Sequence, residues 1–237
     1  MRGVALLGST GSIGRSTLAV LRRQSAHFRL VALTAGCNRA ELEAQAAEWR
    51  PEFVGLAEPQ VDAAYPSGPD VLVEAVLHPG VDIVVNAVVG TAGLDATLAA
   101  LRAGKRVALA NKETLVMAGD LVSAAARAGE GELVPVDSEH SAVLQCIAGR
   151  ESGVGRLIIT GSGGPFREWG AERLAAASVT EALNHPTWRM GRKITVDSAT
   201  LANKALELIE AHHLFGLGYD ALEVVVHPQS IVHAFVE

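Results

Sequence analysis

The stretch VALLGSTGSIG (Val4–Gly14) decides the fold, because it joins an apolar run to a glycine-rich turn and then to a helical pattern. The apolar run predicts a buried strand, and the pattern from Ser12 to Arg23 predicts an amphipathic helix. Glycine permits a tight turn, and the helix amino terminus offers N–H groups and a positive dipole end to a phosphate. The spacing is G-x-x-G-x-x-G and not the usual G-x-G-x-x-G, so the turn fits a dinucleotide site or a plain strand–helix turn.

Outward from this stretch, the first half of the chain alternates apolar runs with helical patterns. Strands are predicted at residues 3–7, 28–33, 52–56, 82–88 and 106–110, and helices at 12–23, 39–49 (with Asn38 as N-cap), 94–103 and 114–128. Strands that alternate with helical crossovers predict an α/β fold, a Rossmann-like doubly wound parallel sheet over residues 1–136. Residues 62–77 fit no element clearly.

Beyond residues 133–135 the pattern changes. Predicted elements are a helix at 141–149, a strand at 156–160, a glycine-rich turn at 161–165, a long helix from about 198 to 215, and strands at 222–226 and 231–236. This order predicts a second, catalytic α+β domain over residues 137–237. The sequence stops within a strand pattern, so we expect it to be a fragment.

Composition and charge exclude several classes of protein. Hydrophobic residues make up 49% and aromatic residues 4%, so the predicted core is aliphatic. A net charge of -6 without a basic run argues against nucleic acid or an anionic membrane as the main partner. Two distant cysteines, Cys37 and Cys146, form no disulfide framework, which favours the cytoplasm. No apolar run reaches the roughly 20 residues of a membrane span.

The end of the second predicted strand bears on which nucleotide binds. Sites that prefer NAD usually carry a carboxylate there, which holds the ribose hydroxyls. The segment TAGCNR (Thr34–Arg39) has none, and the first carboxylate is Glu41. This favours NADP with Arg39 near the extra phosphate, although Arg39 also fits a solvated residue of a first helical turn.

Two polar clusters in the second half suggest a metal and substrate site. The triplet DSE (Asp137–Glu139) supplies the hard oxygen ligands that Mg²⁺ or Mn²⁺ prefers, but an acidic helix start looks the same. Asn203, Lys204 and Glu207 can share one helix face. That face would suit a phosphorylated substrate beside a metal, or it is an ordinary salt bridge on a solvent-facing surface.

Six motifs occur along the chain: GSTGSIG (Gly8–Gly14), ANKE (Ala110–Glu113), PVDSEHSA (Pro135–Ala142), TGSGGPF (Thr160–Phe166), HPTWRMGRKITVDSATLANKALELIEAHHLFG (His185–Gly216) and HPQSIVHAFVE (His227–Glu237). In this order they resemble the family of 1-deoxy-D-xylulose-5-phosphate (DXP) reductoisomerases. The resemblance covers essentially the whole chain, and its most specific part is the motif that starts at His185.

The resemblance implies an NADPH-dependent enzyme of isoprenoid-precursor synthesis that also needs Mn²⁺, Mg²⁺ or Co²⁺. Such an enzyme rearranges and reduces 1-deoxy-D-xylulose 5-phosphate to 2-C-methyl-D-erythritol 4-phosphate. The cation would polarise the substrate carbonyl, and NADPH would then deliver hydride to the rearranged aldehyde. A cytoplasmic homodimer is expected, with a small phosphorylated sugar as ligand and no nucleic acid or membrane as partner.

The same resemblance assigns roles to individual positions. NADPH would be held by Thr10, Gly11, Ser12, Ile13, Gly36, Asn38, Asn111, Glu113 and Gly191. The metal would be bound by Asp137, Glu139 and Glu207, which with Lys112 would form the catalytic group. The substrate would be bound by Lys112, Ser138, Glu139, Ser162, His185, Ser198, Asn203, Lys204 and Glu207. Trp188 and Met190 would belong to a lid loop.

The sequence departs from the family pattern in two places. Cys37 stands where many members carry lysine, so NADP preference would rest on Arg39 or on the backbone. Family members also continue into a C-terminal helical domain that this sequence lacks. Two other hypotheses remain: a different NAD(P) oxidoreductase, which would leave the DSE triplet and the Asn203–Glu207 face unexplained together, and a nucleotide-binding dimer without turnover.

Overall fold

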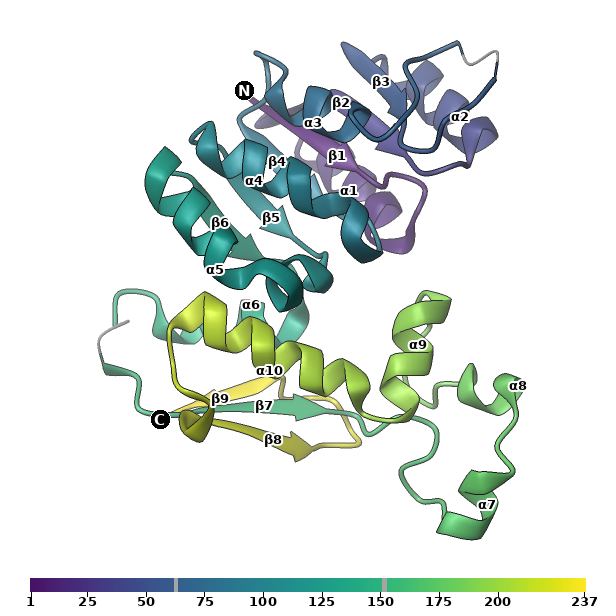
Figure 1. The fold of residues 1–237 in the computed structure, drawn as a ribbon, viewed down its shortest axis with the longest axis vertical. Coiled ribbons are helices and arrows are strands. Elements are labelled where there is room, and N and C mark those ends of the chain that lie inside the picture. The colour runs from purple at the N-terminus through teal and green to yellow at the C-terminus, as the bar shows by residue number, and fades with distance from the viewer. Residues whose placement is uncertain (62–63, 151–152) are drawn as a thin grey trace. The chain divides into compact units, whose positions relative to one another are not determined.

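The computed structural model describes residues 1–61, 64–150 and 153–237, which form two compact units, Met1–Val136 and Asp137–Glu237 (Figure 1). Strands of the first unit are β1 (Arg2–Leu7), β2 (Phe28–Ala35), β3 (Phe53–Leu56), β4 (Ile83–Asn86), β5 (Arg106–Leu109) and β6 (Glu132–Pro135). Its helices are α1 (Ser12–Arg23), α2 (Arg39–Trp49), α3 (Val71–Leu77), α4 (Leu94–Arg102) and α5 (Lys112–Gly129), with a 3-10 turn η1 (Gly90–Gly93).

The first unit is a doubly wound parallel sheet. Its strand order is β3-β2-β1-β4-β5-β6, and each neighbouring pair is parallel. The chain therefore starts at the centre and winds outward in both directions, which confirms the predicted Rossmann-like fold. The predicted elements of this unit are confirmed with ends that shift by one or two residues. The unassigned region contains α3, and its residues 62–63 lie outside the described part.

The sheet is buried because helices cover its faces. Strand β1 is buried at five of its six residues, as expected for a strand covered on both sides. On one side, Leu18 and Leu21 of α1 and Leu42 of α2 pack with Leu6 and Leu33 of the sheet. Helices α3 and α4 lie over the sheet in Figure 1, and their buried residues are mostly valine, leucine and alanine. Aliphatic packing thus fits the low aromatic content.

The glycine-rich turn explains how α1 lies so close to β1. Gly8 has a φ of 82°, a backbone conformation that favours glycine. A Cβ atom added at Gly14 would lie 2.4 Å from the Gly8 carbonyl oxygen and 2.5 Å from that of Ser9. Gly14 is therefore needed for packing, whereas a Cβ atom at Gly11 would meet its nearest atom at 3.4 Å.

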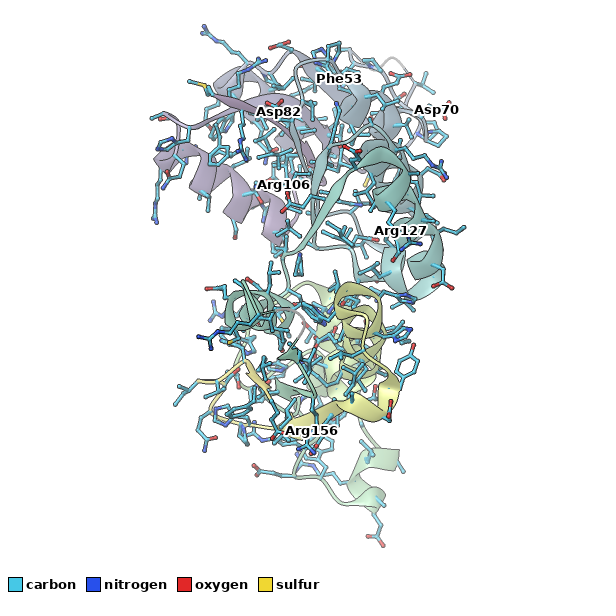
Figure 2. All side chains as sticks on the ribbon, turned by 90° about the vertical axis from the view of Figure 1, so that its left-hand side faces the viewer. Phe53, Asp70, Asp82, Arg106, Arg127 and Arg156 are labelled. Atoms are coloured by element: carbon cyan, nitrogen blue, oxygen red, sulfur yellow. The ribbon has the colours of Figure 1, made fainter. Side chains whose placement is uncertain are left out.

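Different groups lie at the two ends of the strands in this sheet, the amino-terminal edge and the carboxyl-terminal edge. At the amino-terminal edge, Asp82 and Arg106 precede or open β4 and β5 (Figure 2). There the Asp82 carboxylate accepts from the Gly3 N–H over 2.7 Å, and the Asp82 carbonyl accepts from the Arg106 N–H over 3.2 Å. At the opposite edge, the glycine-rich turn follows β1. Strand β1 lies between β2 and β4, and the strand order runs in opposite directions on its two sides. Ligands of doubly wound sheets bind at such a switch point.

The second unit is a mixed α+β structure, as predicted. Its strands are β7 (Leu157–Gly161), β8 (Leu222–Val226) and β9 (Ala234–Val236), in the order β8-β7-β9. Its helices are α6 (Ser138–Ile147), α7 (Ala171–Ala175), α8 (Val179–Ala182), α9 (Arg192–Ala199) and α10 (Ala202–Phe215), with a 3-10 turn η3 (Tyr219–Ala221). Strand β7 pairs in parallel with β8 and antiparallel with β9.

Two predicted helices of this unit need correction. The helix predicted at 141–149 begins three residues earlier as α6, so the DSE triplet forms its start. The long helix predicted from about 198 to 215 is two helices, α9 and α10. Leu201 separates them, because its φ of 61° is left-handed and interrupts the helical path.

One face of the small sheet carries the core of the second unit. Leu157 of β7 packs with Val143 and Ile147 of α6, and Phe215 at the end of α10 packs against this group. Because side chains alternate along a strand, the opposite face holds Phe235 of β9, which is exposed.

A matched pair of glycine variants tests the packing of α1 on β1. We expect Gly14→Ala to destabilise the first unit by about 1–3 kcal/mol, because overpacking against backbone atoms forces a shift. Gly11→Ala should leave stability nearly unchanged, since its Cβ atom has room. Urea unfolding followed by circular dichroism would measure both. Equal stability of the two variants would contradict this account.

Candidate functional site

The second unit contains a cavity of about 340 Å³ that gathers all of the predicted metal ligands and all of the predicted substrate residues except Lys112. The lining comes from the start of α6, the turn after β7, the segment before α9, both α9 and α10, and the segment before β9. Predicted residues in this lining are Asp137, Ser138, Glu139, Ser162, His185, Trp188, Met190, Ser198, Asn203, Lys204 and Glu207.

Three carboxylates converge at one side of the cavity. Asp137, Glu139 and Glu207 each offer an oxygen, and these atoms lie within 4.8 Å of one another. Asp137 is the N-cap residue of α6, yet its side chain makes no capping hydrogen bond to that helix. The donor set is made only of hard oxygens, which suits a divalent cation such as Mg²⁺ or Mn²⁺.

Lys204 balances part of this negative charge. Its Nζ lies 2.6 Å from Glu139 Oε1, also pairs with Glu207, and donates to the Thr160 carbonyl over 2.8 Å. Burial lowers the pKa of the Lys204 ammonium, but Glu207 and Glu139 outweigh burial and raise that pKa above its ordinary value. Removing one partner of a buried ion pair typically costs about 3–5 kcal/mol, so these charges hold each other in place.

The interpretation of Asn203, Lys204 and Glu207 as a solvent-facing salt bridge is wrong. The three residues are 8%, 7% and 1% exposed. The break at Leu201 starts α10 immediately before them, and the helical spacing then places all three on the inward face. Asn203 donates its side-chain amide to a Glu207 carboxylate oxygen and so orients it.

The turn after β7 provides a hydroxyl group, and the segment before α9 provides an imidazole group. A Cβ atom at Gly164 would lie 2.2 Å from the Ser198 carbonyl oxygen, so glycine lets this turn pack on α9. His185 Nδ1 accepts from the backbone N–H groups of Thr187 and Trp188, at 3.1 and 2.9 Å. The neutral ring therefore carries its proton on Nε2, 3.3 Å from Ser162 Oγ. Burial, and then the positive charge of Arg167, lower the pKa of His185.

Several lining residues had no role in the sequence analysis. These are Gly161, Gly163, Gly164, Ile194, Leu201, Ser230 and His233. Ser230 and His233 belong to the motif His227–Glu237, for which no side-chain role was predicted. A positive φ of 52° at Ser230 bends that segment, and serine gives no local signal of such a bend.

The predicted cofactor residues lie mostly at the carboxyl-terminal edge of the large sheet. Thr10, Gly11, Ser12 and Ile13 follow β1, Gly36 and Asn38 follow β2, and Asn111 and Glu113 follow β5. Gly191 belongs to the second unit as the N-cap of α9. Lys112, predicted to contact substrate, is a buried residue of the first unit and begins α5.

Two asparagines shape the loops at this edge. Asn38 caps α2 by accepting from the Glu41 N–H over 3.4 Å, which confirms the predicted N-cap. Glu41 also binds Arg15 of α1 at 2.6 Å, and this bond lowers the pKa of the Glu41 carboxyl. Asn111 donates to the carbonyls of Val88 and Gly90, so it joins the end of β5 to the loop after β4. Arg39 pairs with Glu43 over 2.7 Å on a half-exposed surface.

Fold and site together define a class: a chain with a dinucleotide-type α/β unit and a second unit whose cavity is lined by carboxylates. Residues 4–119 match 1-deoxy-D-xylulose 5-phosphate reductoisomerase, and residues 133–215 match the C-terminal domain model of the same enzyme. The chain belongs to the 1-deoxy-D-xylulose 5-phosphate reductoisomerase family.

Individual relatives agree with this assignment. The reductoisomerase of Heliobacterium modesticaldum is 50% identical over all of this chain and 64% of its own length. A crystal structure of a DOX-P reductoisomerase with NADPH, fosmidomycin and magnesium aligns with a TM-score of 0.94 and 44% identity, over 100% of this chain and 64% of that one. The Zymomonas mobilis enzyme with NADPH gives 0.88 and 44%, with the same coverage. This chain thus spans a little under two thirds of these relatives.

Among the described residues, no helix combines the length and the apolar character that a membrane span needs.

The lowered pKa of His185 can be measured directly. We expect NMR titration of the imidazole to give a pKa below the ordinary value of about 6.5. Arg167→Gln should raise the pKa of His185 but not return it to the ordinary value, because burial is the larger cause of the shift. The unfolded chain binds this proton more readily, so the stability that His185 contributes is full above about pH 6.5 and declines below it. A value of 6.5 or higher in the unsubstituted protein would contradict the assignment.

Proposed function

We propose that this chain carries the cofactor, metal and substrate sites of a DXP reductoisomerase, which converts 1-deoxy-D-xylulose 5-phosphate to 2-C-methyl-D-erythritol 4-phosphate with NADPH. The observation that supports this most is the convergence of Asp137, Glu139 and Glu207 in a cavity that also holds phosphate-binding types of side chain. The family assignment makes this reaction the expected one.

The carboxylate group fits a divalent cation. Glu207 is 1% exposed and lies beside two further carboxylates, so one lysine leaves the group with net negative charge. A bound cation would supply Lewis-acid polarisation of the substrate carbonyl and hydroxyl oxygens. Asn203 and Lys204 hold the Glu207 side chain toward the cavity, so the ligands are oriented by the chain itself.

Further lining residues of the cavity fit the phosphate and hydroxyl groups of the substrate. Ser162 and Ser198 bring hydroxyls, Asn203 an amide, and His185 a neutral ring that donates from Nε2. Neutral donors bind a phosphate without requiring a strongly basic surface, and Lys204 adds local positive charge. Trp188, which is 46% exposed, and Met190 lie on the lining as apolar cover and belong to the proposed lid.

The first unit fits NADPH. The turn of Thr10–Ile13 lies at the amino terminus of α1, where a pyrophosphate is favoured, and Gly11, Ser12 and Ile13 are exposed there. Gly36 and Asn38 follow the neighbouring strand, with no carboxylate before Glu41, and Glu41 is already paired with Arg15. The negative charge of Glu41 is therefore already balanced near the position where the extra phosphate of NADP would bind.

Glu207→Gln tests the proposed metal site. The amide keeps the shape of the side chain but removes one anionic ligand, so turnover and its dependence on Mn²⁺ should largely disappear. NADPH binding should stay within about twofold, because the cofactor residues after β1 and β2 are in the other unit. Oxidation of NADPH at 340 nm with 1-deoxy-D-xylulose 5-phosphate measures the first effect, and fluorescence titration of NADPH the second.

Glu168→Gln is a matched control, because Glu168 is an exposed glutamate of the same unit whose salt bridge is to Arg167. It should retain full Mn²⁺ dependence. Unchanged activity of Glu207→Gln would refute its role as a ligand. Binding of NADPH without turnover in the unsubstituted chain would instead favour a nucleotide-binding protein.

We also propose a homodimer formed through the open face of the small sheet. Phe235 is 49% exposed and Val225 39%, and both project from the face opposite the unit's core. Exposed apolar side chains that cluster on one sheet face are typical of an interface. Exposed Glu223 and Arg156 pair at 3.0 Å beside them and would form a polar rim.

Light scattering coupled to size-exclusion chromatography tests the dimer. The chain should elute as a dimer, and Phe235→Glu should shift it toward the monomer because a buried carboxylate would lack a partner. Val20→Glu replaces an apolar residue of the first unit that is 57% exposed, and it should stay dimeric. A monomeric unsubstituted chain would rule this interface out.

The cysteines favour the cytoplasm as the compartment of this enzyme. Cys37 and Cys146 are both free and exposed. Exposed free thiols persist most readily where the surroundings are reducing, and we infer that this protein works there.

A further inference from the structure

A buried histidine joins the two helices that carry the proposed metal ligands. His140 of α6 is fully buried, and its Nε2 lies 2.9 Å from the backbone carbonyl oxygen of Glu207 on α10. A carbonyl oxygen can only accept a hydrogen bond, so His140 donates from Nε2. His140 therefore binds the backbone of Glu207, and the side chain of Glu207 is one of the three clustered carboxylates.

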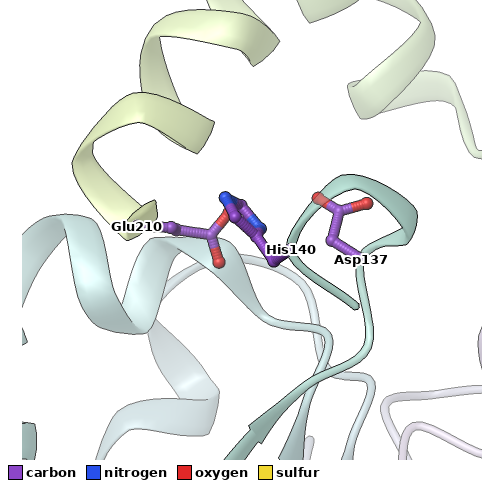
Figure 3. Close-up of side chains that lie close together, drawn as sticks. All are labelled: Asp137, His140 and Glu210. Atoms are coloured by element: carbon purple, nitrogen blue, oxygen red, sulfur yellow. The ribbon is translucent and has the colours of Figure 1, made fainter. Parts of the chain in front are cut away.

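The other nitrogen of the same ring faces a second glutamate. His140 Nδ1 lies 3.9 Å from Glu210 Oε2, and Glu210 is only 4% exposed. Asp137, His140 and Glu210 each offer an atom to a group within 4.8 Å, and in Figure 3 the ring lies between the two carboxylates. One side chain thus contacts α10 at two positions that are three residues apart, which fixes both the rotation and the height of this helix.

Such a fixed point is needed because α10 starts at an irregular residue. Leu201 has a left-handed φ, and Glu207 follows six residues later. At the rise of an α-helix, Glu207 lies about 9 Å from this break, so a pivot of only about 10° would move it roughly 1.6 Å. Metal ligation tolerates distance errors of only about 0.2 Å.

We propose that His140 and Glu210 are positioning residues, a brace that holds Glu207 of α10 beside Asp137 and Glu139 and so sets the affinity for the divalent cation. The brace rests on the metal site of the proposed function. It contacts the backbone and a neighbouring carboxylate, and it is not itself assigned as a ligand. Loss of the brace would make the relative positions of the three carboxylates less fixed, but all three carboxylates would still be present.

Two substitutions of His140, by glutamine and by asparagine, test the two ring nitrogens separately. In His140→Gln the amide nitrogen takes the place of Nε2 and can still donate to the Glu207 carbonyl. In His140→Asn the amide nitrogen takes the place of Nδ1, so this bond is lost. We expect His140→Asn to weaken Mn²⁺ binding about 10–100-fold, as for other groups that orient metal ligands. His140→Gln should stay within about threefold, and Glu210→Gln should lie between the two.

Isothermal titration of the full chain with MnCl₂ at one pH would give these affinities, and NADPH titration would report on the other unit. The matched control is His212→Gln, because His212 also lies on α10 and its Nδ1 lies 2.6 Å from the Leu217 carbonyl oxygen, a bond that a glutamine amide in the place of Nε2 does not reproduce. This variant should alter thermal stability without changing Mn²⁺ affinity. All brace variants should bind NADPH normally.

Several outcomes decide the proposal. Unchanged Mn²⁺ affinity in folded His140→Asn, or equal losses in the Asn and Gln variants, would overturn the brace. If His140→Asn does not fold, near-normal affinity of His140→Gln with weaker binding by Glu210→Gln supports it, and the reverse order overturns it. Glu207→Gln separates this from the proposed function: normal Mn²⁺ binding there refutes the metal site itself, whatever the brace variants do.

Discussion

The second unit depends on one electrostatic constraint, the burial of Lys204 between Glu139 and Glu207. Each of these ions loses hydration on burial, a cost of several kcal/mol, which only close partners can offset. The constraint therefore links the start of α6, the middle of α10 and the Thr160 carbonyl at the end of β7. The cavity lies where these three elements meet. A single cation cannot balance the three carboxylates, and the site is thus prepared for a second positive charge.

Both units place their functional loops after the carboxyl ends of parallel strands. In the first unit the loops follow β1, β2 and β5, and in the second the turn Ser162–Gly164 follows β7. The N–H groups of Gly8 and Ser9, directly after β1, still donate to the Thr34 carbonyl of β2, so the N–H groups suited to a ligand are those of the first turn of the helix that follows. Glycine is required where these loops touch a neighbouring helix, as at Gly14 and Gly164. The same arrangement therefore places the proposed cofactor site in one unit and the proposed substrate cavity in the other.

The sequence predicted the parts of this structure that local periodicity controls. Strands of the large sheet and the shared face of Asn203 and Glu207 follow from the spacing of apolar and polar residues. Burial of that face did not follow, because the same spacing also describes a solvated salt bridge. The break at Leu201 was missed because leucine rarely adopts a left-handed φ, and only packing around α9 and α10 can impose it. Ser230 was missed for the same reason, and tertiary contacts rather than local sequence decided both positions.

The charge of the whole chain has little influence on what the cavity can bind. A net charge of -6 would repel an anion at long range, but the Debye length at physiological salt is only about 8 Å. Within that distance the cavity presents hydroxyls, an amide and the Nε2–H of His185 as well as the three carboxylates. The lowered pKa of His185 keeps its ring neutral. A neutral ring donates one hydrogen bond and brings no charge that would compete for the carboxylates. Neutral donors beside anionic ligands would therefore let one small cavity accept the proposed phosphate and divalent cation together.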